Sequence, residues 1–109
     1  MPTIEVEHYC SADGSDMFAS WFDGLRDREA RARIAVRIDR LAIGLFGDAK
    51  PLREGVHELR VHHGPGYRVY FAIAGCTVVL LLCGGDKRTQ RAGIARAIGY
   101  WRELQERKR

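Results

Sequence analysis

The sequence predicts an α+β fold of order β-α-α-β-β-β-α, an antiparallel-rich twisted sheet with helices packed on one face. Two observations predict this class. Between residues 55 and 90, three short runs rich in β-branched and aromatic residues are separated by turn signals at residues 64–66 and 74–75. Before and after this segment, apolar residues recur at the spacing of amphipathic helices.

Length and composition favour one globular unit. The 109 residues are 46% hydrophobic and 29% charged, so we expect a single domain over residues 1–109. No apolar run approaches the ~20 residues of a membrane helix. The first residues, MPTIEVEHYC, lack the basic and then apolar segments of a secretory signal. We therefore expect a cytoplasmic protein without a membrane partner.

Charge is distributed unevenly along the chain. Residues 1–49 hold 6 Lys and Arg against 9 Asp and Glu, a net charge of −3. Residues 50–109 hold 12 against 5, a net charge of +7. The basic half also contains the three patterned runs, which favours a polyanion or an acidic protein as the partner.

The first elements follow from periodicity. Residues 3–10 alternate between two sides and predict a half-buried strand, and residues 12–16 form a turn with helix N-cap residues. Helical spacing then predicts a short helix whose apolar side chains belong to the core: Phe18, Trp21, Phe22 and Leu25.

A longer helix is predicted to open at Asp27-Arg28-Glu29. Its apolar stripe consists of Ile34, Ile38, Leu41 and Leu45. The arginines off this stripe are expected on a solvated face, with Glu29 paired to Arg33: Arg33, Arg37 and Arg40. We expect both helices to cover the same face of the sheet, and residues 46–54 to form a loop.

The residues on the two faces of the three predicted strands indicate where a functional surface lies. In the first, His57, Leu59, Val61 and His63 share one side; in the second, Tyr67, Val69, Phe71 and Ile73 do. The third, residues 76–83, is apolar on both sides, as an inner strand is. A last helix is predicted from about Arg88 to Glu106. The sheet face opposite the helices is then expected to expose Arg60, Arg68 and Tyr70.

The three cysteines, Cys10, Cys76 and Cys83, form no CxxC pair. Each lies in an apolar, strand-like run, so we expect buried and inert thiols.

Several stretches resemble the RelE/ParE superfamily of bacterial toxins, in the branch of addiction-module killer proteins related to HigB-type toxins. The matching stretches are WFDGLRDREARARIAVRIDRL, GDAKPLREGVHELRVHHGPGYRVYF and VVLLLCGGDKRTQ, within residues 21–90. The resemblance implies a type II toxin held silent by a cognate helix-turn-helix (HigA-like) antitoxin in a hetero-oligomer. Many members of the superfamily are endoribonucleases that cut messenger RNA in the ribosomal A site, whereas the ParE limb poisons DNA gyrase.

Metal-free RNA cleavage, which requires no cofactor, uses the ribose 2′-hydroxyl as the nucleophile. It needs a base, an acid and cations for the phosphate. Arginine suits the phosphate because its planar fork donates two parallel hydrogen bonds. Arg60 and Arg68, on adjacent strands, are the first candidates. The alternative is that both are solvated arginines paired with Glu58 or Glu54.

Further candidates flank this pair. The resemblance implicates lysines such as Lys87 and Lys50 in phosphate binding or base chemistry, although residues 84–87 can equally be a turn and a helix cap. Tyr70 can stack on a base or lie under the last helix. Arg53 and Arg88 are RNA-binding candidates. Near the C-terminus the superfamily's better-known ribonucleases place a functional tyrosine, whereas here IGYWRELQERKR predicts helix packing and leaves the general acid unassigned.

The histidines do not predict a metal site. His62 and His63 are adjacent on a strand and point to opposite faces. His62, on the side of Arg60, is a candidate acid or base.

The sequence leaves three alternative functions. The first is an endoribonuclease acting on translated messenger RNA at the ribosome, neutralised by an antitoxin that covers the basic face. The second is a non-enzymatic toxin that inhibits gyrase through the basic segment from Arg96 to Arg109. The third is a relic that only binds its antitoxin.

Overall fold

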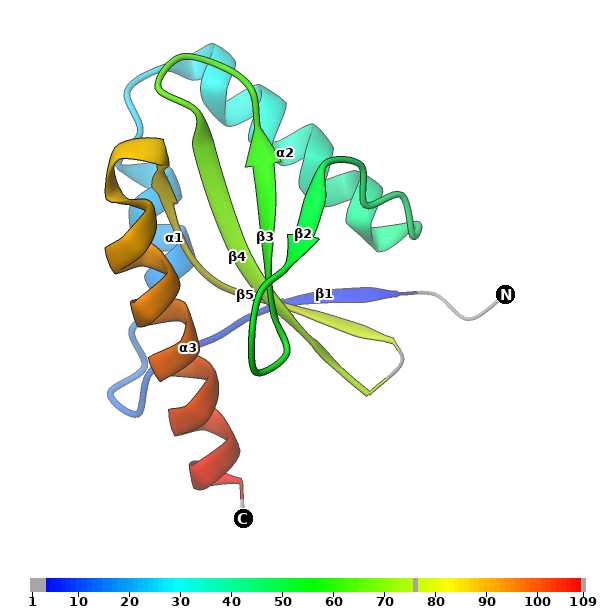
Figure 1. Cartoon of the computed structure of the whole chain (residues 1–109), viewed down its shortest axis with the longest axis vertical. Helices are drawn as coiled ribbons and strands as arrows, with labels where there is room; N and C mark the ends of the chain where they lie inside the picture. Colours follow the sequence, from blue (N-terminus) through cyan, green and yellow to red (C-terminus); the bar gives the residue numbers. More distant parts are fainter. Residues whose placement is uncertain (1–3, 76, 109) are drawn as a thin grey trace.

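The computed structural model describes residues 4–75 and 77–108 as a mixed five-stranded sheet between helices (Figure 1). The elements in chain order are β1 (Glu5–His8), α1 (Met17–Asp23), α2 (Arg28–Ala42), β2 (Ala49–Pro51), β3 (Val56–Val61), β4 (Tyr67–Ala74), β5 (Val78–Asp86), the 3₁₀ turn η1 (Lys87–Thr89) and α3 (Gln90–Arg107). This α+β class is the predicted one, and the predicted order holds apart from one additional strand.

The additional strand, β2, lies in the segment predicted as a loop. The sheet order is β1-β5-β4-β3-β2, with β1 parallel to β5 and the other neighbours antiparallel. β2 pairs with the outer edge of β3 and places Lys50 opposite Glu58. A strand of three residues that ends in a proline is too short to show a period of two, so its pairing comes from the neighbouring edge.

Helices cover both faces of the sheet, and the prediction of helices on a single face is wrong. α1 and α2 lie on one face and α3 lies on the other (Figure 1). The core under α1 and α2 contains Phe18, Ile34, Leu41, Leu59, Val61, Val69, Phe71, Val79 and Leu81. The core under α3 contains Tyr9, Val56, Tyr70, Ala72, Leu80, Leu82, Cys83, Ala97 and Ile98. The side chains predicted to share a face do so, but the second face is also buried.

A β-bulge in β5 supplies part of the second core. Tyr70 pairs with Cys83 and Phe71 pairs with Leu81, so Leu82 is the extra residue. Leu82 and Cys83 therefore both belong to the α3 side although they are consecutive. Strict alternation, on which the sequence argument relied, does not hold at this point.

α2 begins as predicted and ends earlier. Asp27 caps it by accepting from the backbone N–H groups of Glu29 and Ala30, and Glu29 pairs with Arg33 at 2.9 Å. The helix stops at Ala42, so Leu45 lies beyond the apolar stripe and is 58% exposed.

Arg37 does not lie on a solvated face, contrary to the prediction. Its guanidinium donates to the backbone carbonyls of Arg60 at 2.6 Å, Phe46 at 3.1 Å and Asp48 at 3.3 Å. It therefore ties the segment before β2 to β3, and burial lowers the pKa of this guanidinium.

The two described cysteines differ in burial. Cys83 is buried, and burial raises the pKa of its thiol to about 12, as expected for an inert residue. Cys10 is exposed, so the prediction of burial is wrong there. Cys76 lies outside the described residues.

No helix in the described part of the chain combines the length and the apolar character needed to span a bilayer.

We expect Gly84→Ala to destabilise the fold by about 2 kcal/mol or more, because the core is already closely packed. A Cβ at Gly84 would lie 2.1 Å from the Trp21 ring, whereas a Cβ at the helical Gly99 would meet nothing within 4 Å. Gly99→Ala, the matched control, should stabilise α3 by up to about 1 kcal/mol. Urea unfolding measures both, and equal midpoints for the two variants would contradict the packing.

Candidate functional site

The register of the sheet gathers four charged residues on the face that α3 covers. Arg60 lies directly opposite Arg68, Glu58 lies opposite Tyr70, and Lys50 lies opposite Glu58 on the other side. Directly opposite residues project to the same face. Lys50, Glu58, Arg60 and Arg68 therefore share one face, as the sequence predicted for the two arginines.

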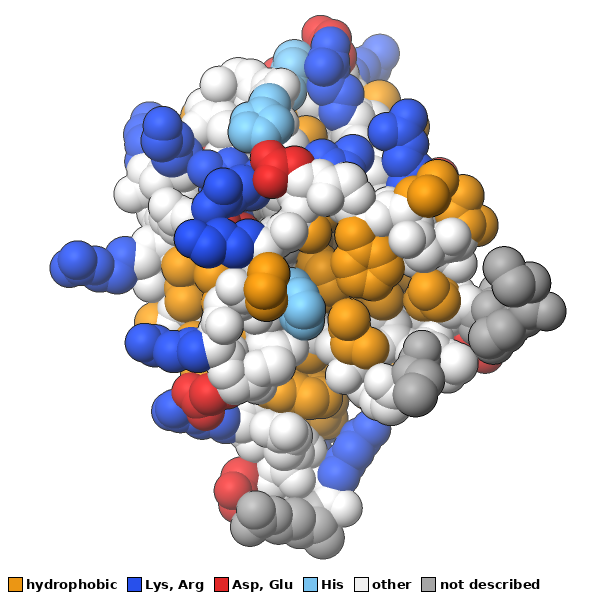
Figure 2. Space-filling model, turned by 45° about the vertical axis from the view of Figure 1, so that its right-hand side comes forward, with side chains coloured by type: hydrophobic (Ala, Val, Ile, Leu, Met, Phe, Trp, Pro, Cys, Tyr) orange, Lys and Arg blue, Asp and Glu red, His pale blue; other side chains and the backbone are white. Residues whose placement is uncertain are grey.

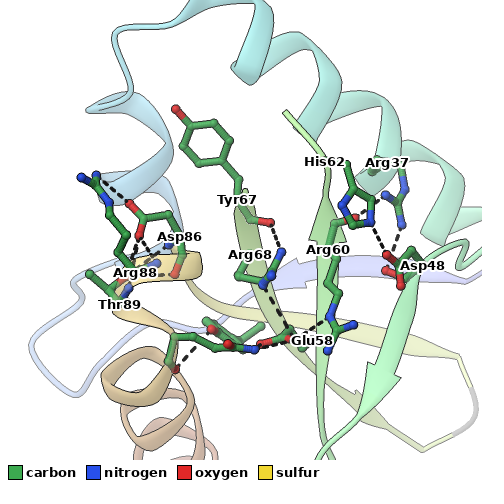
Figure 3. Close-up of polar contacts among 12 residues, drawn as sticks. Arg37, Asp48, Glu58, Arg60, His62, Tyr67, Arg68, Asp86, Arg88 and Thr89 are labelled. Carbon is green, nitrogen blue, oxygen red and sulfur yellow. Dashed lines mark hydrogen bonds and ion pairs between the residues drawn. The ribbon is translucent and has the colours of Figure 1, made fainter. Parts of the chain in front are cut away.

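Glu58 is the centre of this group (Figure 3). Its side chain is completely buried and accepts a hydrogen bond from Nε of Arg60 at 2.9 Å. The amide of Gln90, the first residue of α3, donates to both carboxylate oxygens at 2.9 and 3.2 Å. A charge-assisted pair and two amide bonds together satisfy a carboxylate that burial would otherwise penalise.

Arg68 lies behind Arg60 and is not the exposed residue that the sequence predicted. It is only 7% exposed because β4 is an inner strand beneath the start of α3. Its Nε is 3.9 Å from a Glu58 oxygen, an ion-pair distance, and has no hydrogen-bond partner among the described residues. Arg60, whose side chain is 30% exposed, is the accessible member of the pair.

Tyr70 is buried under α3, so it cannot be a platform for an RNA base. Its ring is fully enclosed, and its hydroxyl lies 3.5 Å from the backbone carbonyl of Gln90. Burial, and then the charge of Glu58, raise the pKa of this phenol well above its usual value. The alternative interpretation, a tyrosine under the last helix, is the one that the structure supports.

The two lysines are exposed on either side of the arginine pair. A Cβ on Gly66 would lie 3.5 Å from Cβ of Lys87 and 3.8 Å from Nη1 of Arg68, so both side chains lie close to this turn. The backbone N–H of Lys87 donates to the carbonyl of Gly66 at 2.8 Å. Lys50 is exposed on β2 beside Glu58.

The corner before α3 is also a helix cap. The Asp86 carboxylate accepts from the backbone N–H groups of Arg88 and Thr89, and the Thr89 hydroxyl bonds the Asp86 N–H. Arg88 extends into solvent, with 81% of its side chain exposed, and pairs with Asp86 at 3.4 Å. Arg53 is exposed in the turn between β2 and β3.

His62 pairs with Asp48 at the end of β3, at the opposite end of Arg60 from Glu58 (Figure 3). This hydrogen bond lowers the pKa of the Asp48 carboxyl. Asp48 also accepts the backbone N–H of Arg60 on its carbonyl, at 2.9 Å. The other three histidines have structural contacts: His57 stacks on Phe71, His63 pairs with Asp27 at 3.0 Å, and His8 pairs with Asp16 at 2.7 Å.

Within residues 4–75 and 77–108, no group of three or more His, Cys, Asp and Glu side chains is arranged to hold a metal ion.

Three residues of the site were not found from sequence. Glu58 was considered only as a surface partner, although alternation already placed it on the face of Arg60. Gln90 is far from β3 in sequence, and nothing local indicates its contact with Glu58. Arg37 was assigned to solvent because the carbonyls that it binds belong to irregular backbone and to the edge of β3.

A sheet flanked by helices, with an arginine pair over a buried carboxylate, defines a small α+β protein compatible with a RelE-like fold. The model of the family "Phage derived protein Gp49-like (DUF891)" matches residues 20–97, and the chain belongs to this family. The Gp49-like family is of the addiction-module killer type and is associated with toxin–antitoxin modules. An uncharacterized protein of Haemophilus influenzae (strain ATCC 51907 / DSM 11121 / KW20 / Rd) is 48% identical over 80 residues, which cover 73% of this chain and 81% of that protein.

We expect Glu58→Gln to destabilise the protein by about 3 kcal/mol, because it leaves the buried Arg68 without a compensating charge. The same change at Glu54, which pairs with Arg102 at the surface, should cost less than about 1 kcal/mol. Chemical unfolding at neutral pH compares the two variants. If the free energy of unfolding falls as little for Glu58→Gln as for Glu54→Gln, the Glu58 carboxylate does not hold the arginine pair in place.

Acid should remove the contribution of the Asp48 carboxylate to the stability of the fold. Because its pKa is lowered in the folded state, the ionised carboxylate stabilises the fold above the unfolded pKa of about 3.9. That contribution is lost as pH falls through the lower folded pKa. Asp48→Asn should therefore lower stability at pH 6, by no more than about 1 kcal/mol at this half-exposed site, and approach wild type near pH 2. Urea midpoints measured across this range test the sign, and a gap that widens in acid would contradict it.

Proposed function

We propose that this protein is the toxin of a type II toxin–antitoxin module and acts as a metal-independent endoribonuclease on messenger RNA. The observation that carries the proposal is the pairing of Arg60 with Arg68 over the buried Glu58. The association of the Gp49-like family with toxin–antitoxin modules supports the biological setting.

The arrangement suits a phosphate because the arginines are held in place before a ligand arrives. Nε of Arg60 is bound to Glu58, so its two Nη groups are the part of the guanidinium that can bind phosphate oxygens. Arg68, buried on β4 opposite Arg60, adds a second fixed positive charge. The exposed lysines Lys50 and Lys87 flank the pair. Preorganised cations stabilise the charge that develops on phosphorus in the transition state.

His62 is the candidate for proton transfer. It lies two residues beyond Arg60, its side chain is 72% exposed, and Asp48 orients its ring through a hydrogen bond. An imidazole held in place by a carboxylate is a common group for accepting and returning a proton in catalysis. Glu58 cannot take this part, since it is fully buried and its oxygens are occupied.

The proposed reaction needs no external reactant. The ribose 2′-hydroxyl loses its proton to the base, and its oxygen forms a bond to the adjacent phosphorus. The bond from phosphorus to the 5′-oxygen breaks, and that oxygen takes up a proton. The products are a 2′,3′-cyclic phosphate and a 5′-hydroxyl end, which require only acid–base groups and cations.

The substrate and partner follow the resemblance to RelE-type toxins. We propose that translated messenger RNA at the ribosome is the substrate. A HigA-like helix-turn-helix antitoxin is the proposed inhibitor, and the two proteins would form a hetero-oligomer in the cytoplasm.

Arg60→Gln should abolish the growth arrest caused by a brief pulse of this protein and remove new 5′ ends within coding regions. The reason is loss of the accessible phosphate-binding guanidinium. Primer extension on cellular messages, with translation active or blocked, measures the ends. Arg68→Ala is a poorer test because Arg68 is buried and its removal also affects folding.

Arg28→Gln is the matched control, since Arg28 is exposed at the start of α2, on the other side of the sheet, and does not line the groove that contains His62. It should arrest growth and cut messages like wild type. Full cleavage by a folded Arg60→Gln variant would overturn the site. Growth arrest with intact messages would instead indicate a non-enzymatic toxin acting on gyrase, and no arrest would indicate a chain that only binds its antitoxin.

A further inference from the structure

A cleft beside the arginine pair is not used by the proposed reaction. It lies between the turn after β2 and the first turns of α3 and has a volume of about 470 Å³. This volume is in the range of small-ligand sites. Its lining residues are Leu52, Arg53, Gln90, Arg91 and Ile94.

The lining combines an apolar floor with a basic rim. Leu52 and Ile94 pack on the core under α3 and are partly exposed in the cleft. Arg53 and Arg91 are exposed, and neither forms an ion pair with another described residue. None of the five lining residues is acidic. The ligand that suits this surface is flat and apolar in its centre and anionic at its edge.

The basic character of this side extends beyond the cleft. Figure 2 shows Lys and Arg side chains along the left edge of the molecule, the side on which Figure 1 places α3. An anionic chain that follows this edge would therefore meet several cations.

The cleft is joined to the arginine pair through one side chain. Gln90 lines the cleft, and its amide donates to both oxygens of Glu58, which in turn accepts from Arg60. Only the Glu58 carboxylate therefore separates Gln90, which lines the cleft, from the Arg60 guanidinium that we assign to the scissile phosphate. This proximity favours a nucleic acid over an acidic peptide, because the same polymer then occupies both sites.

We infer that the cleft is a nucleotide subsite for single-stranded RNA, an inference that rests on the proposed function. One base lies against Leu52 and Ile94, and Arg53 and Arg91 bind its flanking phosphates. Bases of single-stranded RNA stack on guanidinium planes, burial of the apolar surface of Leu52 and Ile94 under a base is favourable, and arginine binds phosphate with two parallel hydrogen bonds. Gln90 then contacts the bound nucleotide and Glu58 together.

The test is binding of a short fluorescein-labelled single-stranded RNA with 2′-O-methyl groups, which cannot be cleaved because the nucleophile is blocked. Fluorescence anisotropy should show that Arg53→Glu and Arg91→Glu each weaken binding about tenfold or more, the scale of a lost charge-assisted hydrogen bond. The matched control is Arg28→Glu, the same change at an exposed arginine that begins α2 and lines neither this cleft nor the groove that contains His62. It should change the affinity less than about twofold, since α2 packs on the opposite face of the sheet from α3.

A second arm isolates the base. Replacing single nucleotides by abasic sites should weaken binding by about tenfold at one position, the scale of stacking a base on a protein surface. That difference should shrink in Leu52→Ser and in Ile94→Ser, and thermal unfolding of each variant confirms that it is folded. No position dependence in the folded variants would overturn the subsite.

The remaining outcomes separate the inference from the proposed function. If Arg53→Glu and Arg91→Glu bind and cut RNA like wild type, the subsite is wrong and the ribonuclease proposal stands. If the wild-type protein neither binds nor cuts RNA, both fail. If the two variants keep RNA binding but escape neutralisation by the antitoxin, the cleft belongs to the protein partner and the inference is overturned.

Discussion

The buried carboxylate of Glu58 is the interaction on which this side of the molecule depends. It joins β3 to the first residue of α3 through Gln90, and it fixes the two arginines of β3 and β4. A single anion among two guanidiniums leaves the cluster with a net positive charge. The cost of burying that anion is offset by its hydrogen bonds, and the remaining charge is available to an anionic ligand.

The position of α3 is set by contacts around the same cluster. α3 packs its apolar side chains on Tyr70, Ala72 and Leu82, which anchors its first turn beside the arginines. Asp86 caps the turn η1 that leads into the helix, and the β-bulge at Leu82 places an additional apolar side chain of β5 on the face that the helix covers. Fold and candidate site therefore share the same contacts, so a change in one affects the other.

Local patterns predicted the helices, the three long strands and the face shared by Arg60 and Arg68, because each depends on spacing within a short segment. Their surroundings were not predictable in this way. Whether Tyr70 is bare or covered depends on where α3 packs, and that is a tertiary contact between distant residues. Arg37 looked like a solvent-facing arginine because its ligands are backbone carbonyls, which leave no trace in the sequence. The toxin class implied by the resemblance agrees with the family association, while the RelE/HigB assignment and the activity stay predictions.

The parallel pairing of β1 with β5 has a consequence during synthesis. Residues 5–8 leave the ribosome well before their partners in β5, residues 78–81, which emerge only after the intervening segment has been made. Closing so long a loop is slow, and the sheet cannot be completed before β5 is available. Since η1 and α3 follow β5, Gln90 reaches Glu58 later still. A nascent chain would thus lack an assembled arginine cluster until Gln90 has left the ribosome.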